Sequence, residues 1–205
     1  MAKKTIYIVR HGETDYNKSG IVQGRRINAS INEQGQLQRD SFFQAYKEVP
    51  FQKLYTSALK RTRESIQGFI DLGIPVESHD GLDEISWGDY DGTDLFQNEY
   101  YFDMIREWKS GNTHVRPVNG ESPDDVVARQ KPVMQHIVAQ EEDLVLVCMH
   151  GRAIRILMCH LLECGMNKMD EFKHTNLGLY VLEYEDGVYK MIERNRTDHL
   201  IGWED

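Results

Sequence analysis

The hydrophobic positions of the chain follow two patterns, short apolar runs and longer segments with helical spacing. Apolar runs rich in β-branched residues predict strands, and they occupy residues 5–9, 53–57, 75–78 and 144–149. Apolar residues three or four positions apart predict helices, and these segments occupy residues 33–49, 59–72, 94–110, 122–140 and 152–162. Two further strands, at 177–184 and 188–194, flank the turn Glu185-Asp186-Gly187 and predict a β-hairpin.

The strands before the hairpin alternate with the helices along the chain. This order predicts an α/β protein with a largely parallel sheet that helices cover on both faces. A chain of 205 residues can bury a sizeable core, so we expect a single domain over residues 1–205. We expect the segment at about 92–122, with its helix, to form a small inserted cap over the site.

Composition is typical of a globular protein from a reducing compartment. Charged residues make up 28% of the chain and hydrophobic residues 40%. No stretch has the apolar length of a membrane span, and the N-terminus lacks the features of a signal peptide. Cys148, Cys159 and Cys164 lack the pairing of a disulfide framework or a zinc site. We therefore expect a cytoplasmic protein with reduced cysteines.

The charge distribution indicates a small anionic ligand. The net charge is −9, from 24 basic and 33 acidic side chains, which argues against nucleic acid or a membrane as a partner. Basic residues nevertheless gather near the predicted strand ends: Arg10, His11, Arg25, Arg26, Arg61, Arg63, His150, Arg152 and Arg155. Cations gathered in an acidic protein can focus a small anion, although solvated surface charges would give the same pattern.

Two of the predicted strands end in the same way. Arg10-His11-Gly12 follows the first strand, and His150-Gly151 follows the strand at 144–149. Ligands of α/β sheets bind beyond the carboxyl ends of the strands, so both imidazoles reach one crevice if these two strands are neighbours in the sheet. Each glycine would let the backbone approach an anion and present amide donors. One such strand end is typical of a turn, whereas two with an arginine favour a functional site.

These residue types suit phosphoryl transfer, which needs a nucleophile, a positive clamp and a proton donor. His11 is the candidate nucleophile, because a neutral imidazole is nucleophilic at physiological pH. The candidate clamp consists of Arg10, Arg61 and His150, since a planar guanidinium donates two parallel hydrogen bonds to phosphate.

The candidate acid is Glu84, in the run Leu82-Asp83-Glu84-Ile85. If this run is a strand, alternation sends one of the two acidic side chains inward and the other outward. A carboxyl group beside a hydrophobic wall can keep its proton near neutral pH, as a general acid requires.

In these motifs the chain resembles the histidine phosphatase superfamily, the phosphoglycerate-mutase-like group. The run Arg10-His11-Gly12-Glu13-Thr14 is similar to the family's signature, and Ser57-Ala58-Leu59-Lys60-Arg61 is similar to its SxLxR element. The other similar positions are Asn17, Gln23-Gly24, the block from Leu82 to Gly92, Gly120-Glu121-Ser122 and His150-Gly151. All of them follow the family's order, between about residues 5 and 177, which makes the resemblance specific.

The resemblance implies a three-layer α/β/α sandwich and an activity that needs no metal and no cofactor. His11 would be phosphorylated, and Glu84 would act as general acid and then as general base. The phosphoryl group would be held by Arg10, Arg61 and His150, with further substrate contacts from Asn17, Gln23, Gly24 and Gly151. Arg152 stands where simpler phosphatases often have a second glycine, and it would add a cation to the pocket.

We expect the substrate to be a small phosphorylated metabolite whose phosphoryl group passes to water. The alternative within the family is a phosphoglycerate mutase, which returns the group to the substrate; such mutases tend to have longer insertions and a closing C-terminal segment. Aromatic cap residues either line the pocket or pack the cap onto the body: Phe96, Tyr100, Tyr101, Phe102 and Trp108. The sequence leaves a homodimer open.

Three other interpretations remain. The run Asp89-Tyr90-Asp91-Gly92-Thr93 matches the DxDxT motif of haloacid-dehalogenase-like phosphatases, although no apolar strand precedes it. Cys148 would suit a cysteine phosphatase, but Ile154 stands where that loop needs arginine, so Cys148 is a candidate core residue. A non-catalytic anion-binding module would keep the arginines and would not need His11 or Glu84.

Overall fold

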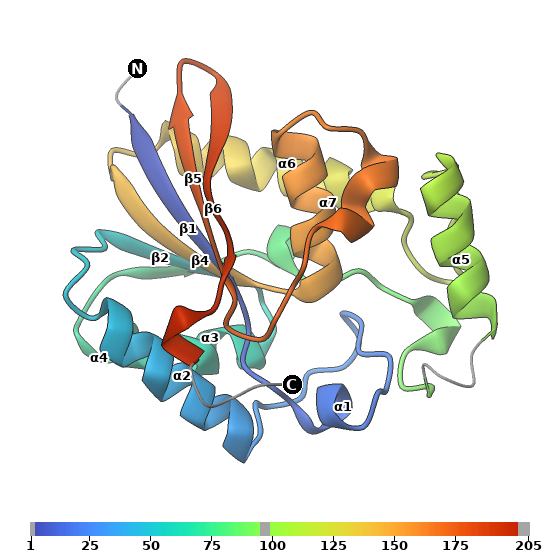
Figure 1. Cartoon of the computed structure of the whole chain (residues 1–205), viewed down its shortest axis with the longest axis horizontal. Coiled ribbons are helices and arrows are strands. Elements are labelled where there is room, and N and C mark those ends of the chain that lie inside the picture. The colour runs from blue at the N-terminus through green and yellow to red at the C-terminus, as the bar shows by residue number, and fades with distance from the viewer. Residues whose placement is uncertain (1–2, 95–98, 201–205) are drawn as a thin grey trace.

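The computed structural model describes residues 3–94 and 99–200. A six-stranded sheet forms its centre, in the order β3-β2-β4-β1-β5-β6 (Figure 1). The strands are β1 (Lys4–Arg10), β2 (Lys53–Thr56), β3 (Val76–Ser78), β4 (Leu144–Met149), β5 (Leu179–Glu185) and β6 (Val188–Arg196). The first four are parallel, β5 is antiparallel to β1, and β5 and β6 form a hairpin. The predicted mostly parallel sheet with its C-terminal hairpin is confirmed.

Helices cover both faces of this sheet. The α-helices are α1 (Asp15–Lys18), α2 (Glu33–Tyr46), α3 (Lys60–Ser65), α4 (Gln67–Asp71), α5 (Glu99–Ser110), α6 (Pro123–Ala139) and α7 (Gly151–Leu161). Short 3₁₀ turns are η1 (Asp80–Leu82), η2 (Gly88–Tyr90), η4 (Met166–Glu171) and η5 (Asp198–Leu200). Helices α6 and α7 pack on one face and α2 and α4 on the other (Figure 1), which confirms the three layers.

Strand β4 shows how the sheet divides the core. Val145 and Val147 face α6 and α7, whereas Leu146 and Cys148 face α2 and α4, and all four are fully buried. Full burial of an aliphatic side chain contributes about 1.5–3 kcal/mol. Cys148 is thus a core residue, and burial raises the pKa of its thiol, so it cannot serve as a thiolate nucleophile at neutral pH.

Two predicted helices differ from the observed ones. The helix expected at 59–72 is interrupted between α3 and α4, where Ile66 has φ −120° and ψ 19°. The Ser65 hydroxyl donates to the Arg61 carbonyl at 2.6 Å and accepts from the Gly12 amide at 2.8 Å. Such back-bonding from serine bends helices. The helix expected at 94–110 is described from Glu99 onward, since 95–98 lie outside the described residues.

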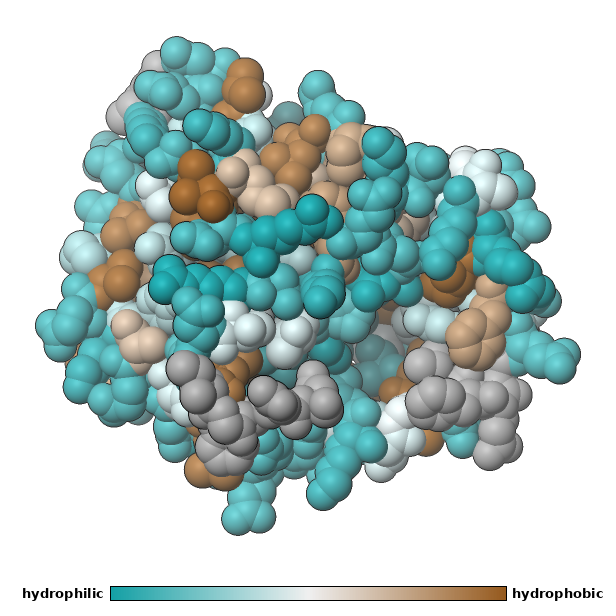
Figure 2. Space-filling model, in the orientation of Figure 1, coloured by the Kyte–Doolittle hydropathy of each residue, from teal (hydrophilic) through white to brown (hydrophobic). Residues whose placement is uncertain are grey.

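The surface is largely polar. On the face shown in Figure 2, hydrophilic side chains predominate and hydrophobic ones appear in small separate groups. Within the described ranges, no helix combines the length and the apolar character that a bilayer crossing needs. The inserted segment contributes α5, which lies at one side of the molecule, beyond η4 and away from α2 (Figure 1).

Candidate functional site

The carboxyl ends of β1 and β4 meet at one edge of the sheet. These strands are parallel neighbours, with Arg10 paired in register with Met149, and the amide of His11 donates to the Met149 carbonyl at 3.0 Å. The His11 and His150 rings therefore lie side by side, with centroids 5.1 Å apart. Both imidazoles lie at the same edge of the sheet, but His150 is fully buried and only His11 lines the pocket there.

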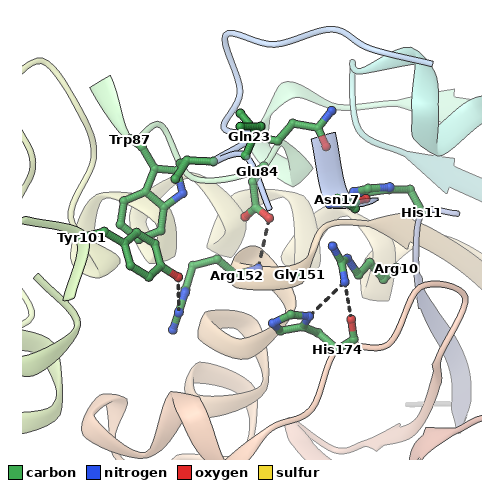
Figure 3. A pocket seen from close by; sticks show the side chains of 12 residues that line it. Arg10, His11, Asn17, Gln23, Glu84, Trp87, Tyr101, Gly151, Arg152 and His174 are labelled. Atoms are coloured by element: carbon green, nitrogen blue, oxygen red, sulfur yellow. Dashed lines mark hydrogen bonds between the residues drawn. The ribbon is translucent and has the colours of Figure 1, made fainter. Parts of the chain in front are cut away.

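A pocket of about 130 Å³ opens beside these strand ends (Figure 3). Its lining includes Arg10, His11, Asn17, Gln23, Glu84, Gly151 and Arg152, all of them candidates from the sequence. It also includes Ile21, Val22, Trp87, Tyr101 and His174. Three sequence candidates do not line it: Gly24, Arg61 and His150.

The His11 side chain is held as a neutral imidazole. Its Nδ1 lies 2.7 Å from the Gly12 carbonyl oxygen, which can only accept, so Nδ1 carries the proton and Nε2 keeps its lone pair. Burial lowers the pKa of His11 well below its usual value, and the charges of Arg61 and Arg10 lower it further. The ring is thus deprotonated at Nε2 across the physiological range, which is the state that a nucleophile needs.

His150 is held by two partners of defined polarity. The Arg61 Nε–H donates to Nδ1 of His150 at 3.2 Å, so the ring proton sits on Nε2 and faces the Ser57 hydroxyl at 2.8 Å. Burial, followed by the Arg61 charge, lowers the pKa of His150 well below its usual value. His150 is therefore a neutral donor whose orientation depends on Arg61.

Arg61 is fully buried and carries the positive charge behind the two histidines. Its Nη1 donates to the Ile27 carbonyl at 2.6 Å, while Nη2 has no hydrogen-bond partner among the described residues. Burial lowers the pKa of Arg61 to about 10, so the guanidinium stays charged at neutral pH. An incompletely satisfied buried guanidinium is well suited to receive an anion.

His174 is a pocket residue that the sequence motifs did not single out. Arg10 Nη1 lies 3.1 Å from His174 Nδ1 and donates to its carbonyl at 2.7 Å (Figure 3). Burial and then Arg10 lower the pKa of His174 to about 2. Nearby, the Asn176 side chain donates to the His11 carbonyl at 2.9 Å. Because β5 is antiparallel to β1, the polar residues just before β5 must lie at this edge, and that was the available signal.

Glu84 lies in the irregular segment after η1, so the prediction based on strand alternation was wrong. Asp83 and Glu84 are both buried, at 4% and 7% exposure. Glu84 accepts hydrogen bonds from the amides of Ala153 at 2.8 Å, Ile85 at 2.9 Å and Arg152 at 3.1 Å. Two of these amides belong to the first turn of α7, where the helix dipole favours a carboxylate.

Asp83 has a separate, structural role. Its Oδ1 accepts from the Ala58 amide at 2.9 Å, and its Oδ2 accepts from Arg25 at 3.2 Å. Asp83 thereby fastens the segment before Glu84 to the segment between β2 and α3.

Arg129 of α6 anchors the backbone on either side of Glu84, and the sequence analysis missed it. It donates to the carbonyls of Gly81 and Asp83 at 2.9 Å and of Glu84 at 3.0 Å. Its other hydrogen bonds go to the Glu121 carboxylate, at 2.9 and 3.1 Å. The Glu121 carboxylate in turn accepts from the Ser86 amide at 2.8 Å.

Two of the glycines expected to contact phosphate, Gly12 and Gly24, serve close packing of the chain instead. The amide of Gly12 donates to the Ser65 hydroxyl at 2.8 Å, and a Cβ at Gly12 would lie 2.8 Å from the Gly35 carbonyl oxygen. A Cβ at Gly24 would lie 2.0 Å from Oδ1 of Asp91. Both positions require glycine for close packing, and the Gly12 amide is already engaged.

Gln23 and Asn17 line the pocket and are tied to Thr14. The Thr14 hydroxyl donates to Gln23 Oε1 at 3.0 Å, which leaves Gln23 Nε2 without a hydrogen-bond partner among the described residues. Asn17 Oδ1 accepts from the Thr14 amide at 3.2 Å as part of a capping box for α1. Gln23 Nε2 is therefore a donor held ready at the pocket wall.

The wall on the α5 side is aromatic. The rings of Trp87 and Tyr101 have centroids 4.6 Å apart, and Tyr101 lies near Arg152 Nη2 at 3.3 Å (Figure 3). Arg152 Nη1 forms an ion pair with Asp170 at 2.5 Å, and Asp170 also pairs with Arg155 and Lys109, so one carboxylate serves three cations. Trp108 is buried in the core.

Tyr100 and Phe102 do not line the pocket. Tyr100 stacks on Tyr90 with centroids 4.4 Å apart, Phe102 is 43% exposed, and Phe96 lies outside the described residues. Both expectations for the cap aromatics therefore hold in part, since Tyr101 lines the pocket and Trp108 packs the cap onto the body.

The DxDxT interpretation does not fit the fold. The run from Asp89 to Thr93 lies at and after η2, at the end of no strand of the sheet. Asp89 is exposed and accepts from the Asn119 side chain at 3.0 Å. A nucleophile of that class needs the end of a buried strand, so we discard this interpretation.

Comparisons with known proteins agree with this geometry. A family model described as "Histidine phosphatase superfamily (branch 1)" matches residues 6–197. A probable phosphatase of Schizosaccharomyces pombe is 27% identical over 95% of this chain and 90% of its own length. A 2,3-bisphosphoglycerate-dependent phosphoglycerate mutase of Brucella ovis is 29% identical over 77% of this chain and 81% of its own. The structure of YhfR from Bacillus stearothermophilus superposes with a TM-score of 0.85 at 23% identity, covering 96% of this chain and 99% of that one.

Proposed function

Because the chain belongs to the histidine phosphatase superfamily, whose members are phosphatases and phosphoglycerate-mutase-like phosphoryl transferases, we propose that it is a metal-independent phosphatase acting through a phosphohistidine on His11. The substrate is a small phosphomonoester. The observation that carries the proposal is the neutral His11 ring, with its proton on Nδ1 and its lone pair on Nε2, in the pocket that also holds Glu84 and Arg10.

In the first step, Nε2 of His11 attacks phosphorus and the bond from phosphorus to the ester oxygen breaks. Protonated Glu84 gives its proton to the leaving alkoxide. Arg10 and Arg61 stabilise the charge on the transferring group, and His150 supports Arg61 from behind through the bond from Arg61 Nε to its Nδ1. The Gln23 amide supplies a further donor at the wall.

In the second step, Glu84 takes a proton from water as that water attacks the phosphohistidine. The N–P bond breaks, inorganic phosphate leaves, and His11 regains its lone pair. The backbone amides of Ala153, Ile85 and Arg152 hold the Glu84 carboxylate in position for this step.

Hydrolysis is preferred over phosphoglycerate isomerisation because a relative that covers nearly the whole chain is described as a phosphatase. The similarity to a mutase over 77% of the chain supports the alternative of a phosphoglycerate mutase, which an assay can test. A panel of phosphomonoesters that includes 3-phosphoglycerate, with phosphate release and isomerisation scored separately, distinguishes the two. Isomerisation faster than phosphate release would replace the phosphatase with a mutase.

The mechanism is tested with His11→Gln and Glu84→Gln, with His114→Gln at an exposed position as control. His11→Gln should abolish both turnover and the acid-labile phosphoenzyme. Glu84→Gln should lower kcat on an alkyl phosphate by roughly 10²–10⁴-fold. On p-nitrophenyl phosphate, whose leaving group needs no proton, Glu84→Gln should let the phosphoenzyme accumulate. Turnover that survives His11→Gln, or that EDTA abolishes, would contradict the proposal.

A further inference from the structure

Two histidines and a glutamate meet at the edge strand of the sheet, and none of them lines the pocket. Glu77 lies in β3, His79 follows β3 directly, and His136 lies near the end of α6. One ligand atom from each residue falls within 4.8 Å of the other two. Among the residues that the structure describes, this is the group of histidine, cysteine and acidic side chains with the spacing of a metal site.

The fold explains why these three side chains converge. Glu77 and His79 stand two residues apart in extended backbone, with φ −131° and ψ 128° at His79, so they point to the same face. Helix α6, which carries His136, packs against the face of the sheet on which Tyr55 lies. Tyr55 pairs in register with Glu77, and its ring lies 6.1 Å from the His79 ring and 6.5 Å from the His136 ring.

The contacts within the cluster are short. Nε2 of His79 and Nε2 of His136 each lie 2.9 Å from Oε1 of Glu77. Both nitrogens and this oxygen therefore lie close enough together to share one cation after small movements.

We propose that Glu77, His79 and His136 bind a zinc ion, with water as the fourth ligand. Two imidazoles and one carboxylate with an open position are a donor set that zinc accepts in tetrahedral geometry. Metal–ligand bonds of about 2.0–2.2 Å place tetrahedral ligands about 3.4 Å apart. The Glu77 oxygen would therefore retreat from both nitrogens by about half an ångström.

The surroundings allow an ion to enter and hold the ligands in place. The His79 and His136 side chains are 23% and 39% exposed, so the cluster lies near the surface, although the two Nε2 atoms are covered. The Gln140 side-chain amide lies 3.3 Å from Nδ1 of His136 and donates to the His136 carbonyl at 3.2 Å, which helps to hold this ring in place. Zinc bound here ties the edge strand β3 to α6.

Lys53 provides a further test of the proposal. Its Nζ lies 2.7 Å from Oε2 of Glu77. The ammonium holds this carboxylate in place, but its charge repels a divalent cation at the same site. Lys53→Met should tighten zinc binding about threefold or more, a change opposite in sign to the loss of a ligand.

The test is a zinc titration by calorimetry of the full chain after treatment with EDTA and desalting. We expect wild type to bind one equivalent at this site, and His79→Asn, His136→Asn and Glu77→Gln each to weaken binding at least tenfold. His114→Asn, which removes an exposed histidine elsewhere, should leave it unchanged. At zinc a hundredfold above the wild-type Kd, wild type should gain roughly 5–10 °C in Tm and His136→Asn should gain about half of that or less.

A second titration, on His11→Gln, excludes binding at the pocket histidines. If zinc affinity is the same in wild type, His79→Asn, His136→Asn and Glu77→Gln, or if only His11→Gln loses it, the proposal is wrong. Circular dichroism of each variant without metal verifies folding. Glu77→Gln keeps the shape of the side chain, so it decides the matter if a histidine variant does not fold.

Discussion

At the scale of residues, each histidine of the site takes its protonation state from a neighbour of fixed polarity. The Gly12 carbonyl can only accept from His11, whereas Arg61 and Arg10 can only donate, to His150 and His174 respectively. Burial disfavours the charged ring in all three cases. The site therefore keeps a nucleophilic lone pair and a donor N–H side by side at physiological pH.

Arg129 is the residue whose replacement best separates positioning from contact with substrate. In Arg129→Met the segment around Glu84 loses its hydrogen bonds to α6 and to Glu121, so Glu84 moves out of alignment. We expect kcat to fall roughly 10–100-fold with KM little changed, because displacements of about 1 Å cost up to about 10²-fold. Steady-state kinetics on a phosphomonoester measure the split.

Arg129→Lys should recover part of kcat, since one ammonium can reach some of the same carbonyls. The control is Arg116→Met, which removes an exposed arginine that pairs with Asp125. A rise in KM at constant kcat would mean that Arg129 acts on substrate and not on Glu84.

At the scale of elements, the segment that carries Glu84 is held by pairing with the residues before α6. The Asp89 amide donates to the Val118 carbonyl at 3.1 Å, and the Glu121 amide donates to the Ser86 carbonyl at 2.8 Å. Gly88 lies between these bonds with φ +61°, and a Cβ there would lie 1.9 Å from the Val118 carbonyl oxygen. Gly88 is thus required by its backbone conformation and by the close approach of the two segments.

Gly88→Ala and Gly73→Ala form a matched pair that separates these two causes. Gly73 also has positive φ, +84°, but nothing lies within 4 Å of its missing Cβ. Gly73→Ala should cost only the left-handed conformation, about 1–2 kcal/mol in the free energy of unfolding. Gly88→Ala adds a backbone clash and should cost more than about 3 kcal/mol. Urea denaturation of both variants measures the difference, and equal losses would show that the segments separate without penalty.

At the scale of the whole molecule, burial of neutral histidines makes stability depend on pH. The pKa values of His11, His150 and His174 are lowered in the folded chain, His174 to about 2, while an unfolded histidine titrates near 6.5. Below about pH 6.5 the unfolded chain therefore binds protons that the folded chain does not. Their contribution is fully present above pH 6.5 and is lost as pH falls, by up to about 1.4 kcal/mol per pH unit for each histidine.

His174→Gln tests this dependence, because glutamine can still accept from Arg10 but does not titrate. Between pH 6.5 and 5 the free energy of unfolding of His174→Gln should fall less steeply than that of wild type. The difference in slope corresponds to roughly one proton bound by the unfolded chain and not by the folded chain. Denaturation curves at several pH values measure it, with His114→Gln as an exposed control. Asp91, whose pKa burial raises to about 6, acts with the opposite sign but equally in both proteins. Parallel slopes would show that His174 is protonated in the folded state.

Much of this protein was predictable because it depends on local pattern. The runs at 5–9 and 144–149 predict buried strands that each end in a histidine, and the structure shows that these strands are neighbours. The predictions that failed did so because of contacts between residues that lie far apart in the chain. Ser65 interrupts its helix because it also binds Gly12, 53 positions away in the chain. Glu84 is buried by α7 and not by strand alternation, because its partners are amides 68 and 69 positions further along the chain.

The sequence by itself determined the order of strands and helices, the two histidine-bearing strand ends and the arginines that accompany them, since hydrophobic periodicity and residue chemistry are local properties. Only the tertiary structure decided which side chains complete the site. His174 reaches the pocket through antiparallel pairing of β5, and Arg129 reaches the backbone of Glu84 from α6. Likewise, Glu77 and His79 meet His136 only because α6 packs against the edge of the sheet. Such contacts depend on register and packing between distant segments, which no local pattern encodes.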